Sequence, residues 1–192
     1  MLDGFSKEGT VWWPGRRWRL VATDDILKSQ ATFLMNDRVM VDERAFVFFG
    51  AFGGTRNPPP NLYVKTFEDK DGAPLNGSNT YRLRIPPNVP TTQFWAVVAY
   101  DTQTAGFIRE APVVGLDSYN RNLRNNADGT IDIYLAPKAP HGQENNWIST
   151  APGRPFFLLF RNYAPEPSVL KKESTWMLGD VEQIRAAKGI AR

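Results

Sequence analysis

Cysteine is absent from the sequence, and histidine occurs once, as His141. The lack of cysteine excludes disulfides, thiolate nucleophiles and cysteine-ligated metal sites. One imidazole cannot build the metal centre of a cupin or the zinc site of a HExxH protein, and it would have to be the base of any Ser-His-Asp triad. We therefore expect no metal ion and no cofactor, and we interpret APHGQENNW as a loop between strands.

The sequence also has no large excess of positive or negative charge, and it has no long apolar run. The chain carries 23 Lys and Arg against 20 Asp and Glu, a formal net charge of +3. Non-specific nucleic-acid binding needs many cationic contacts on one face, so we expect no nucleic-acid partner. The longest apolar stretches, FWAVVAY and FFLLF, are far shorter than the roughly 20 residues that span a bilayer, so no membrane span is predicted.

Nucleotide-binding and targeting motifs are missing as well. The sequence has no GxxxxGK[ST] motif and no GxGxxG motif after a strand. No charged start followed by a long apolar run marks a signal peptide. These observations leave the compartment open: cytoplasmic by default, and periplasmic if the chain is a processed or truncated form.

Residues 1–55 are expected to form an aromatic lead-in and a helical segment. The stretch TDDILKSQATFLMND begins with two aspartates that suit the first turn of a helix, and a second helical segment is expected over about 39–49. Three prolines in GGTRNPPPN end any helix because they lack amide donors. This break predicts a boundary between residues 1–55 and a second domain over 56–192.

Beyond residue 62 the patterning is typical of strands and turns. TYRLRIP alternates apolar and basic residues, as expected for a half-buried strand. FWAVVAYD is almost continuously apolar, which predicts a central strand covered on both faces, and RPFFLLFRNY predicts a second central strand. A short helix is expected from about Asp180. The whole pattern predicts a mainly β fold, a jelly-roll-like β-sandwich preceded by a short helical segment.

Three blocks of the sequence resemble one bacterial family. They are LYVKTFEDKDGAPLNGSNTYRLRIPPNVPTTQFWAVVAYDTQTAGFI, then NADGTIDIYLAPKAPHGQENNWIST, then FFLLFRNYAPEP with a later TWMLGDVE. The family is that of domain of unknown function twelve-fourteen. The matching positions are Asn126, Asp128, Gly129, Gly142, Glu144, Asn146, Trp147 and Trp176. The resemblance implies a jelly-roll β-sandwich with no established reaction, usually the C-terminal part of two-part proteins that begin with domain of unknown function twelve-fifty-four.

The catalytic candidates are two carboxylates, Asp101 and Glu144. Glycoside hydrolysis needs two acids facing each other across roughly 5 to 10 Å. Asp101 follows a buried strand, but an aspartate at such a position commonly caps the next turn, here DTQT. We also expect Glu144 to pair with an arginine such as Arg161. The candidate ligand-binding residues are Trp147, Arg161, Asn146 and Tyr163.

The leading hypothesis is a β-sandwich binding or assembly module without catalysis of its own. Five tryptophans are predicted at element ends or in loops, at positions 12, 13, 18, 147 and 176, where they can fill a domain or subunit interface or stack on a ligand ring. The expected partners are a second domain, another copy in a homo-oligomer, or a small-molecule or glycan ligand.

The alternative is a hydrolase or carbohydrate-active enzyme with a carboxylate-lined cleft at one end of the sandwich. That cleft would bring together Asp101, Glu144, Trp147 and Arg161. A metal-dependent reaction is a third option, and it would need carboxylate and asparagine ligands alone.

Overall fold

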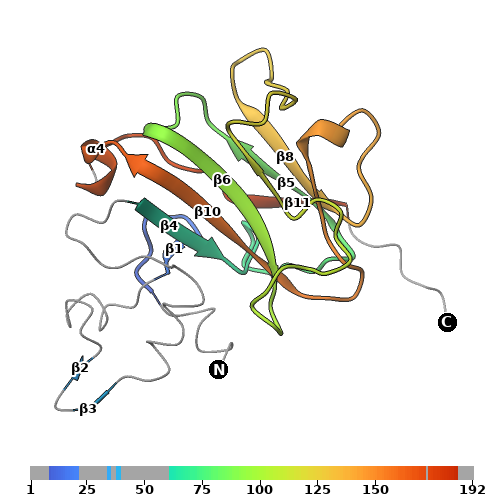
Figure 1. The fold of residues 1–192 in the computed structure, drawn as a ribbon, viewed down its shortest axis with the longest axis horizontal. Coiled ribbons are helices and arrows are strands. Elements are labelled where there is room, and N and C mark those ends of the chain that lie inside the picture. Colours follow the sequence, from blue (N-terminus) through green and yellow to red (C-terminus); the bar gives the residue numbers. More distant parts are fainter. Residues whose placement is uncertain (1–8, 22–33, 36–37, 40–60, 172, 186–192) are drawn as a thin grey trace.

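The computed structural model describes residues 9–21, 34–35, 38–39, 61–171 and 173–185 (Figure 1). They form a β-sandwich of a five-stranded and a four-stranded sheet, with almost no helix. The prediction of a mainly β sandwich is confirmed, and its jelly-roll connectivity stays a prediction. In the part of the chain that the structure describes, no helix is long and apolar enough to cross a bilayer.

The five-stranded sheet has the order β1-β4-β10-β6-β7, and the four-stranded sheet has the order β11-β5-β8-β9. Strands of the first are β1 (Arg19–Leu20), β4 (Asn61–Thr66), β10 (Phe156–Pro165), β6 (Thr91–Asp101) and β7 (Gly115–Asp117). Strands of the second are β11 (Val181–Arg185), β5 (Thr80–Ile85), β8 (Ile131–Ala136) and β9 (Trp147–Ser149). Smaller elements are β2 (Leu34–Met35), β3 (Arg38–Val39), the 3-10 helix η1 (Glu144–Asn146) and helix α4 (Pro167–Leu170).

The almost continuously apolar strands β6 and β10 lie side by side in the five-stranded sheet (Figure 1). Because side chains alternate along a strand, such a run supplies apolar groups to both faces. On β6, Trp95 and Val97 enter the main core between the sheets. On β10, Phe157 and Leu159 belong to a second apolar cluster, which lies on the outer face of the sheet. The prediction of two central strands is therefore confirmed.

The main core fills the space between the two sheets. Strand β5 contributes Tyr81, Leu83 and Ile85, which are at most 1% exposed and obey the alternation of the TYRLRIP pattern. On the facing sheet, Phe160 of β10 stacks on Trp95 of the neighbouring strand β6, with ring centroids 6.3 Å apart. Burial of these large apolar side chains contributes most of the free energy that holds the two sheets together.

The aromatic segment before β1 belongs to the same core. Trp12, Trp13 and Trp18 are 8%, 6% and 0% exposed. The indole Nε1 of Trp18 donates a hydrogen bond to the carbonyl of Gly179 at 2.9 Å, which ties this segment to the chain before β11. These three indoles are buried by other parts of this chain, and their role in an interface with another domain or subunit stays a prediction.

Two helix predictions are corrected by strand pairing. The helices expected between 23 and 49 lie mostly outside the described residues, as does the predicted boundary at 55–56. At 34–35 and 38–39 the backbone is extended, because β2 pairs with β3, so the helix prediction is wrong there. The helix expected from about Asp180 is also wrong: β11 pairs antiparallel with β5. Pairing at this sheet edge overrides the intrinsic helical propensity of EQIR.

Candidate functional site

Asp101 is a turn cap at the end of β6. The carboxylate is buried, and its Oδ1 accepts hydrogen bonds from the amides of Gln103 and Thr104 at 2.7 and 3.0 Å. Its Oδ2 lies 3.6 Å from the guanidinium of Arg154. These contacts fix the DTQT turn, as the sequence pattern indicates.

Glu144 caps the loop that holds His141. Its Oε1 accepts a hydrogen bond from the amide of Gly142 at 2.9 Å, and backbone amides of this loop hold the pKa of Glu144 below its usual value. A lowered pKa favours the ionised carboxylate, which is the form that accepts these hydrogen bonds. The expected ion pair between Glu144 and Arg161 is absent from the structure.

The structure does not bring the four cleft candidates together. The Trp147 indole donates to the carbonyl of Ala136 at 2.8 Å, at the end of β8. Arg161 lies on β10 and contacts Tyr100. No hydrogen bond, ion pair or ring contact of the described residues joins any two of Asp101, Glu144, Trp147 and Arg161. Nor do three His, Asp or Glu side chains of the described ranges gather as a set that would hold a metal ion.

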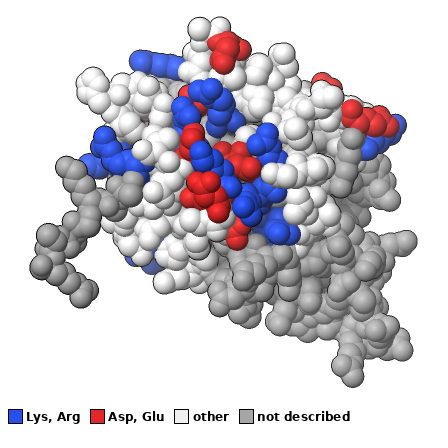
Figure 2. All heavy atoms as spheres, turned by 180° about the vertical axis from the view of Figure 1, so that it is seen from behind, with Lys and Arg blue, Asp and Glu red and all other residues white. Residues whose placement is uncertain are grey.

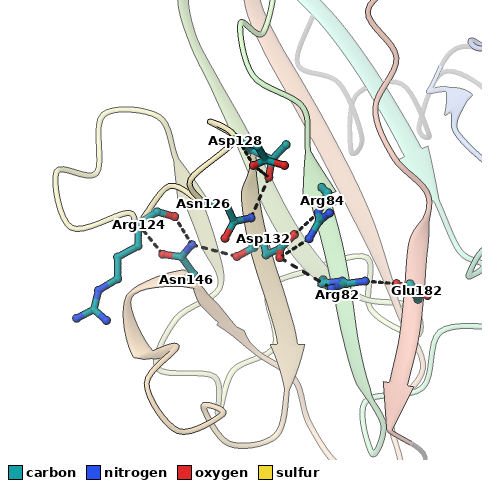
Figure 3. Close-up of polar contacts among 9 residues, drawn as sticks. Arg82, Arg84, Arg124, Asn126, Asp128, Asp132, Asn146 and Glu182 are labelled. Carbon is teal, nitrogen blue, oxygen red and sulfur yellow. Dashed lines mark hydrogen bonds and ion pairs between the residues drawn. The ribbon is translucent and has the colours of Figure 1, made fainter.

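Asn146 joins a loop to the four-stranded sheet. Its side chain is buried, and Figure 3 shows its amide between the backbone of Arg124 and that of Asp132. The Nδ2 group donates to the carbonyls of Arg124 and Asp132 at 2.8 and 3.0 Å, and Oδ1 accepts from the Arg124 amide at 2.8 Å. All these partners are protein backbone groups, so this predicted ligand-binding residue has a structural role here.

The outer face of the four-stranded sheet carries paired charges, which stand side by side near the middle of the face in Figure 2. Asp132 on β8 accepts two hydrogen bonds from Arg84 on β5, from Nε at 2.7 Å and from Nη2 at 2.9 Å (Figure 3). Glu182 on β11 pairs with Arg82 and with Lys70, and these two cations lower the pKa of Glu182 to about 2. Because each charge has a partner within the face, we interpret this surface as solvent-facing.

Replacing Asp132 with asparagine should lower the free energy of unfolding by about 1.5 kcal/mol at pH 7, because a hydrogen-bonded ion pair of a half-exposed arginine is lost. The Arg84 guanidinium holds the pKa of Asp132 below its usual value, so the folded state favours the ionised carboxyl. This stabilisation is fully present above the unfolded pKa and is lost as the pH falls through the folded pKa.

Urea unfolding of both proteins between pH 7 and pH 2 measures the effect. The difference between them should shrink below about pH 4, the ordinary pKa of an aspartate. Asp71→Asn, in an exposed loop, is the control, and its stability should stay within about 0.5 kcal/mol of the wild type. A difference that persists unchanged at pH 2 would show that the carboxylate charge is not what stabilises this pair.

The outer face of the five-stranded sheet is aromatic. Its alternation places Tyr63 of β4 opposite Arg161 of β10, and Tyr163 of β10 opposite Phe94 of β6. We name this group the tyrosine–arginine patch. Its members are Tyr63, Phe94, Tyr100, Tyr119, Arg161 and Tyr163.

The rings of the patch pack against one another. Phe94 and Tyr163 are stacked with centroids 4.2 Å apart, Tyr63 meets Tyr163 edge-on at 5.6 Å, and Tyr119 lies 4.9 Å from Phe94. Because stacked neighbours on one sheet face turn their ring faces toward each other, they present edges and hydroxyl groups outward. Tyr119 ends the row and is 66% exposed.

Arg161 is the only cation of the patch, and it has aromatic partners. Its Nη2 donates a hydrogen bond to the Tyr100 hydroxyl, and its guanidinium carbon lies 5.6 Å from the Tyr63 ring centre and 5.7 Å from that of Tyr100. Its Nε is buried and has no hydrogen-bond partner. Burial raises the pKa of both Tyr63 and Tyr100, so their hydroxyls stay neutral. No carboxylate of the described residues pairs with Arg161.

The sequence predictions include two members of the patch, Arg161 and Tyr163, and miss the other four. The alternation of side chains along the strands is the sequence signal that could have pointed to them. In β6 and β10 most positions between core residues are also apolar or aromatic, which indicates that both faces are covered. The register that aligns these positions across three strands is not visible in the sequence.

Known proteins share the fold of this chain. No curated protein matches the chain. The solved VPA0106 protein of Vibrio parahaemolyticus has the same fold, with a TM-score of 0.58 at 20% identity, over 77% of this chain and 37% of that one. A putative uncharacterized protein of Burkholderia cenocepacia gives a TM-score of 0.43 at 19% identity, over 88% of this chain and 50% of the other. This chain thus spans less than two fifths of the Vibrio protein. Residues 60–167, more than half of the sequence, match the family described as Protein of unknown function (DUF1214), to which this chain belongs.

Proposed function

We propose that this chain is a binding and assembly module that docks onto another protein domain through its tyrosine–arginine patch. The observation that carries the proposal is Arg161, which is half-buried among tyrosines and has no carboxylate partner within the described ranges. Tyrosine and arginine are the residue types enriched in the energetic centres of protein interfaces. A surface of this composition with an exposed ring at its edge suits a protein contact.

The chemistry of Arg161 defines what the partner presents. A guanidinium on aromatic rings is attracted to their faces but is not neutralised by them. A carboxylate of the partner would supply the missing negative charge and accept a hydrogen bond from the unpartnered Nε. Two copies meeting symmetrically on this patch would place one Arg161 near the other, which disfavours a second copy as the occupant.

The occupant we propose is the other domain of two-part family proteins, domain of unknown function twelve-fifty-four. The large share of the Vibrio protein that this chain does not cover supports such an arrangement.

The hydrolase and glycan alternatives gain no support from the site. Asp101 and Glu144 are held by turn and loop amides. Sugar binding uses exposed ring faces, whereas Phe94 and Tyr163 turn their faces toward each other. A second function is therefore not proposed.

Replacing Arg161 with alanine should weaken binding to an isolated twelve-fifty-four domain roughly 30-fold, since truncating one partner of a buried charge pair costs about 2 kcal/mol or more. Isothermal titration calorimetry measures the affinity, and light scattering measures the mass of the complex. Arg84→Ala, on the opposite outer face, is the matched control and should bind as the wild type does.

Three results would contradict the proposal. If the two domains form no complex, the partner is wrong. If they form a complex that Arg161→Ala does not weaken, the patch is wrong. A homodimer that Arg161→Ala dissociates would show that a second copy, rather than the other domain, occupies the patch.

A further inference from the structure

A pocket of about 680 Å³ lies at one end of the four-stranded sheet, on the other sheet from the tyrosine–arginine patch. It forms where β5 begins and where β8 and β11 end. The antiparallel register places Arg185 of β11 opposite Thr80 of β5. The loop that follows β8 supplies a further wall. We name this site the basic pocket, and among its lining residues are Ser78, Thr80, Lys138, His141, Ile184 and Arg185.

The basic pocket combines cations with an absence of acids. Lys138, His141 and Arg185 line it, and the described lining contains no Asp or Glu. Within the ranges that the structure covers, no ion pair joins Lys138 or Arg185 to a carboxylate. Glu144 interacts electrostatically with His141, but the Gly142 amide holds its carboxylate and it does not line the pocket. Cations without internal partners that share one pocket favour an anionic ligand.

The loop wall of the basic pocket is held in place at both of its ends. At its start, the Trp147 indole donates to the carbonyl of Ala136 at 2.8 Å. At its end, the amide of Gln143 donates to the carbonyl of Pro140 at 2.9 Å. Two prolines, at positions 137 and 140, fix φ within the loop. A loop restrained in this way loses little conformational freedom when a ligand binds.

The same loop and strand β5 offer hydrogen-bond donors that the protein does not use. Among the described residues, the amides of Lys138, Ala139 and His141 donate to no acceptor, and the Thr80 hydroxyl makes no hydrogen bond. A phosphate group presents three strong acceptor oxygens and carries nearly two negative charges at neutral pH. Backbone amides, hydroxyls and cations together are the donors that suit it.

The basic pocket also has an apolar side. Ile184 on β11 lines it and is 47% exposed, and Pro137, Ala139 and Pro140 line it from the loop. An inorganic anion would leave these apolar groups in water, whereas an organic group attached to the anion would cover them. The composition of the pocket therefore favours a phosphate ester over free phosphate.

We propose that the basic pocket binds a small organic phosphate monoester. Lys138 and Arg185 bind the phosphate group, and the organic group lies against Ile184 and the prolines of the loop. This site is independent of the docking function proposed for the tyrosine–arginine patch, which lies on the other sheet.

Titration with phenyl phosphate, followed by NMR of untagged protein at constant pH, tests the proposal. His141 is the only histidine of the chain, so its ring protons give resonances that can be assigned without ambiguity. Phenyl phosphate should shift them and saturate with a Kd of about 1 mM or tighter, a range typical of a ligand of this size. Phenol, which lacks the phosphate, should not shift them, and inorganic phosphate should bind roughly fivefold more weakly.

Lys138→Ala and Arg185→Ala should each weaken the binding of phenyl phosphate roughly fivefold, and the double variant roughly 20-fold, because each removes one exposed cation from the pocket. Lys171→Ala is the matched control, since it removes an exposed cation outside the pocket and should bind as the wild type does. All three changes are at exposed side chains, so these variants should fold.

The proposal is overturned if phenyl phosphate leaves the His141 resonances unchanged, or if the double variant binds it as tightly as the wild type. Equal weakening by Lys171→Ala would show that overall charge, rather than this pocket, attracts the anion. Inorganic phosphate that binds as tightly as phenyl phosphate would show that the ligand class is wrong, because the apolar side of the pocket would contribute nothing.

Discussion

Trp18→Ala should lower the free energy of unfolding by about 4 kcal/mol, since truncation of a buried large aromatic typically costs 3 to 5 kcal/mol. Trp18 is 0% exposed and packs within the main core. Its removal also leaves the Gly179 carbonyl without its indole donor, which adds to the loss of packing. Chemical denaturation followed by circular dichroism measures the change, as a lower midpoint with a similar slope.

Trp18→Phe separates the two contributions. It keeps most of the buried ring and removes only the hydrogen bond to Gly179, so about 1 to 2 kcal/mol should be lost. Tyr119→Ala, at a ring that is 66% exposed, should change stability by less than about 0.5 kcal/mol. Should Trp18→Ala stay within 1 kcal/mol of the wild type, the segment before β1 would not be an integral part of the sandwich.

Asn146→Ala should cost about 3 kcal/mol, although Asn146 lies in a one-turn 3-10 helix rather than in the core. Its side chain makes three hydrogen bonds to backbone groups of Arg124 and Asp132. Alanine at position 146 leaves all of these backbone groups without their hydrogen-bond partner. Each unsatisfied buried polar group costs about 1 to 3 kcal/mol, with partial relief where water enters the loop. Thermal unfolding by calorimetry gives the change in stability.

The neighbouring residue provides the control for this prediction. Asn145 is also in η1 but is only half-buried, and Asn145→Ala should cost less than about 0.5 kcal/mol. Native-state hydrogen exchange should show a faster rate at the Arg124 amide in Asn146→Ala, because that amide loses its acceptor. Equal losses from the two asparagine variants would contradict the role assigned to Asn146.

The strands of the sandwich could be predicted from the sequence because their patterns are local. Alternation in TYRLRIP and the apolar runs around Val97 and Leu158 are properties of six to eleven consecutive residues. The C-terminal strand β11 could not be predicted, because its extended form depends on pairing with β5, about 100 residues earlier.

The candidate site could be predicted only in part. Arg161 and Tyr163 stand out as polar and aromatic residues at the end of an apolar strand. Their partners Tyr63 and Phe94 lie about 70 to 100 residues away, and only the sheet register brings them together. That Arg161 lies among aromatic rings, with no carboxylate of the described residues beside it, is a property of packing that no sequence pattern encodes.

The position of β10 between β4 and β6 determines when the five-stranded sheet can assemble during synthesis. Strand β10, which joins these two, is the last strand of the five-stranded sheet to be made. A nascent chain that ends before Phe156 therefore lacks the strand with which both β4 and β6 pair. Such late, non-local pairing slows folding and leaves strand edges open to other chains on the ribosome. The centre of this sheet therefore cannot assemble before residues 156–165 have emerged from the ribosome.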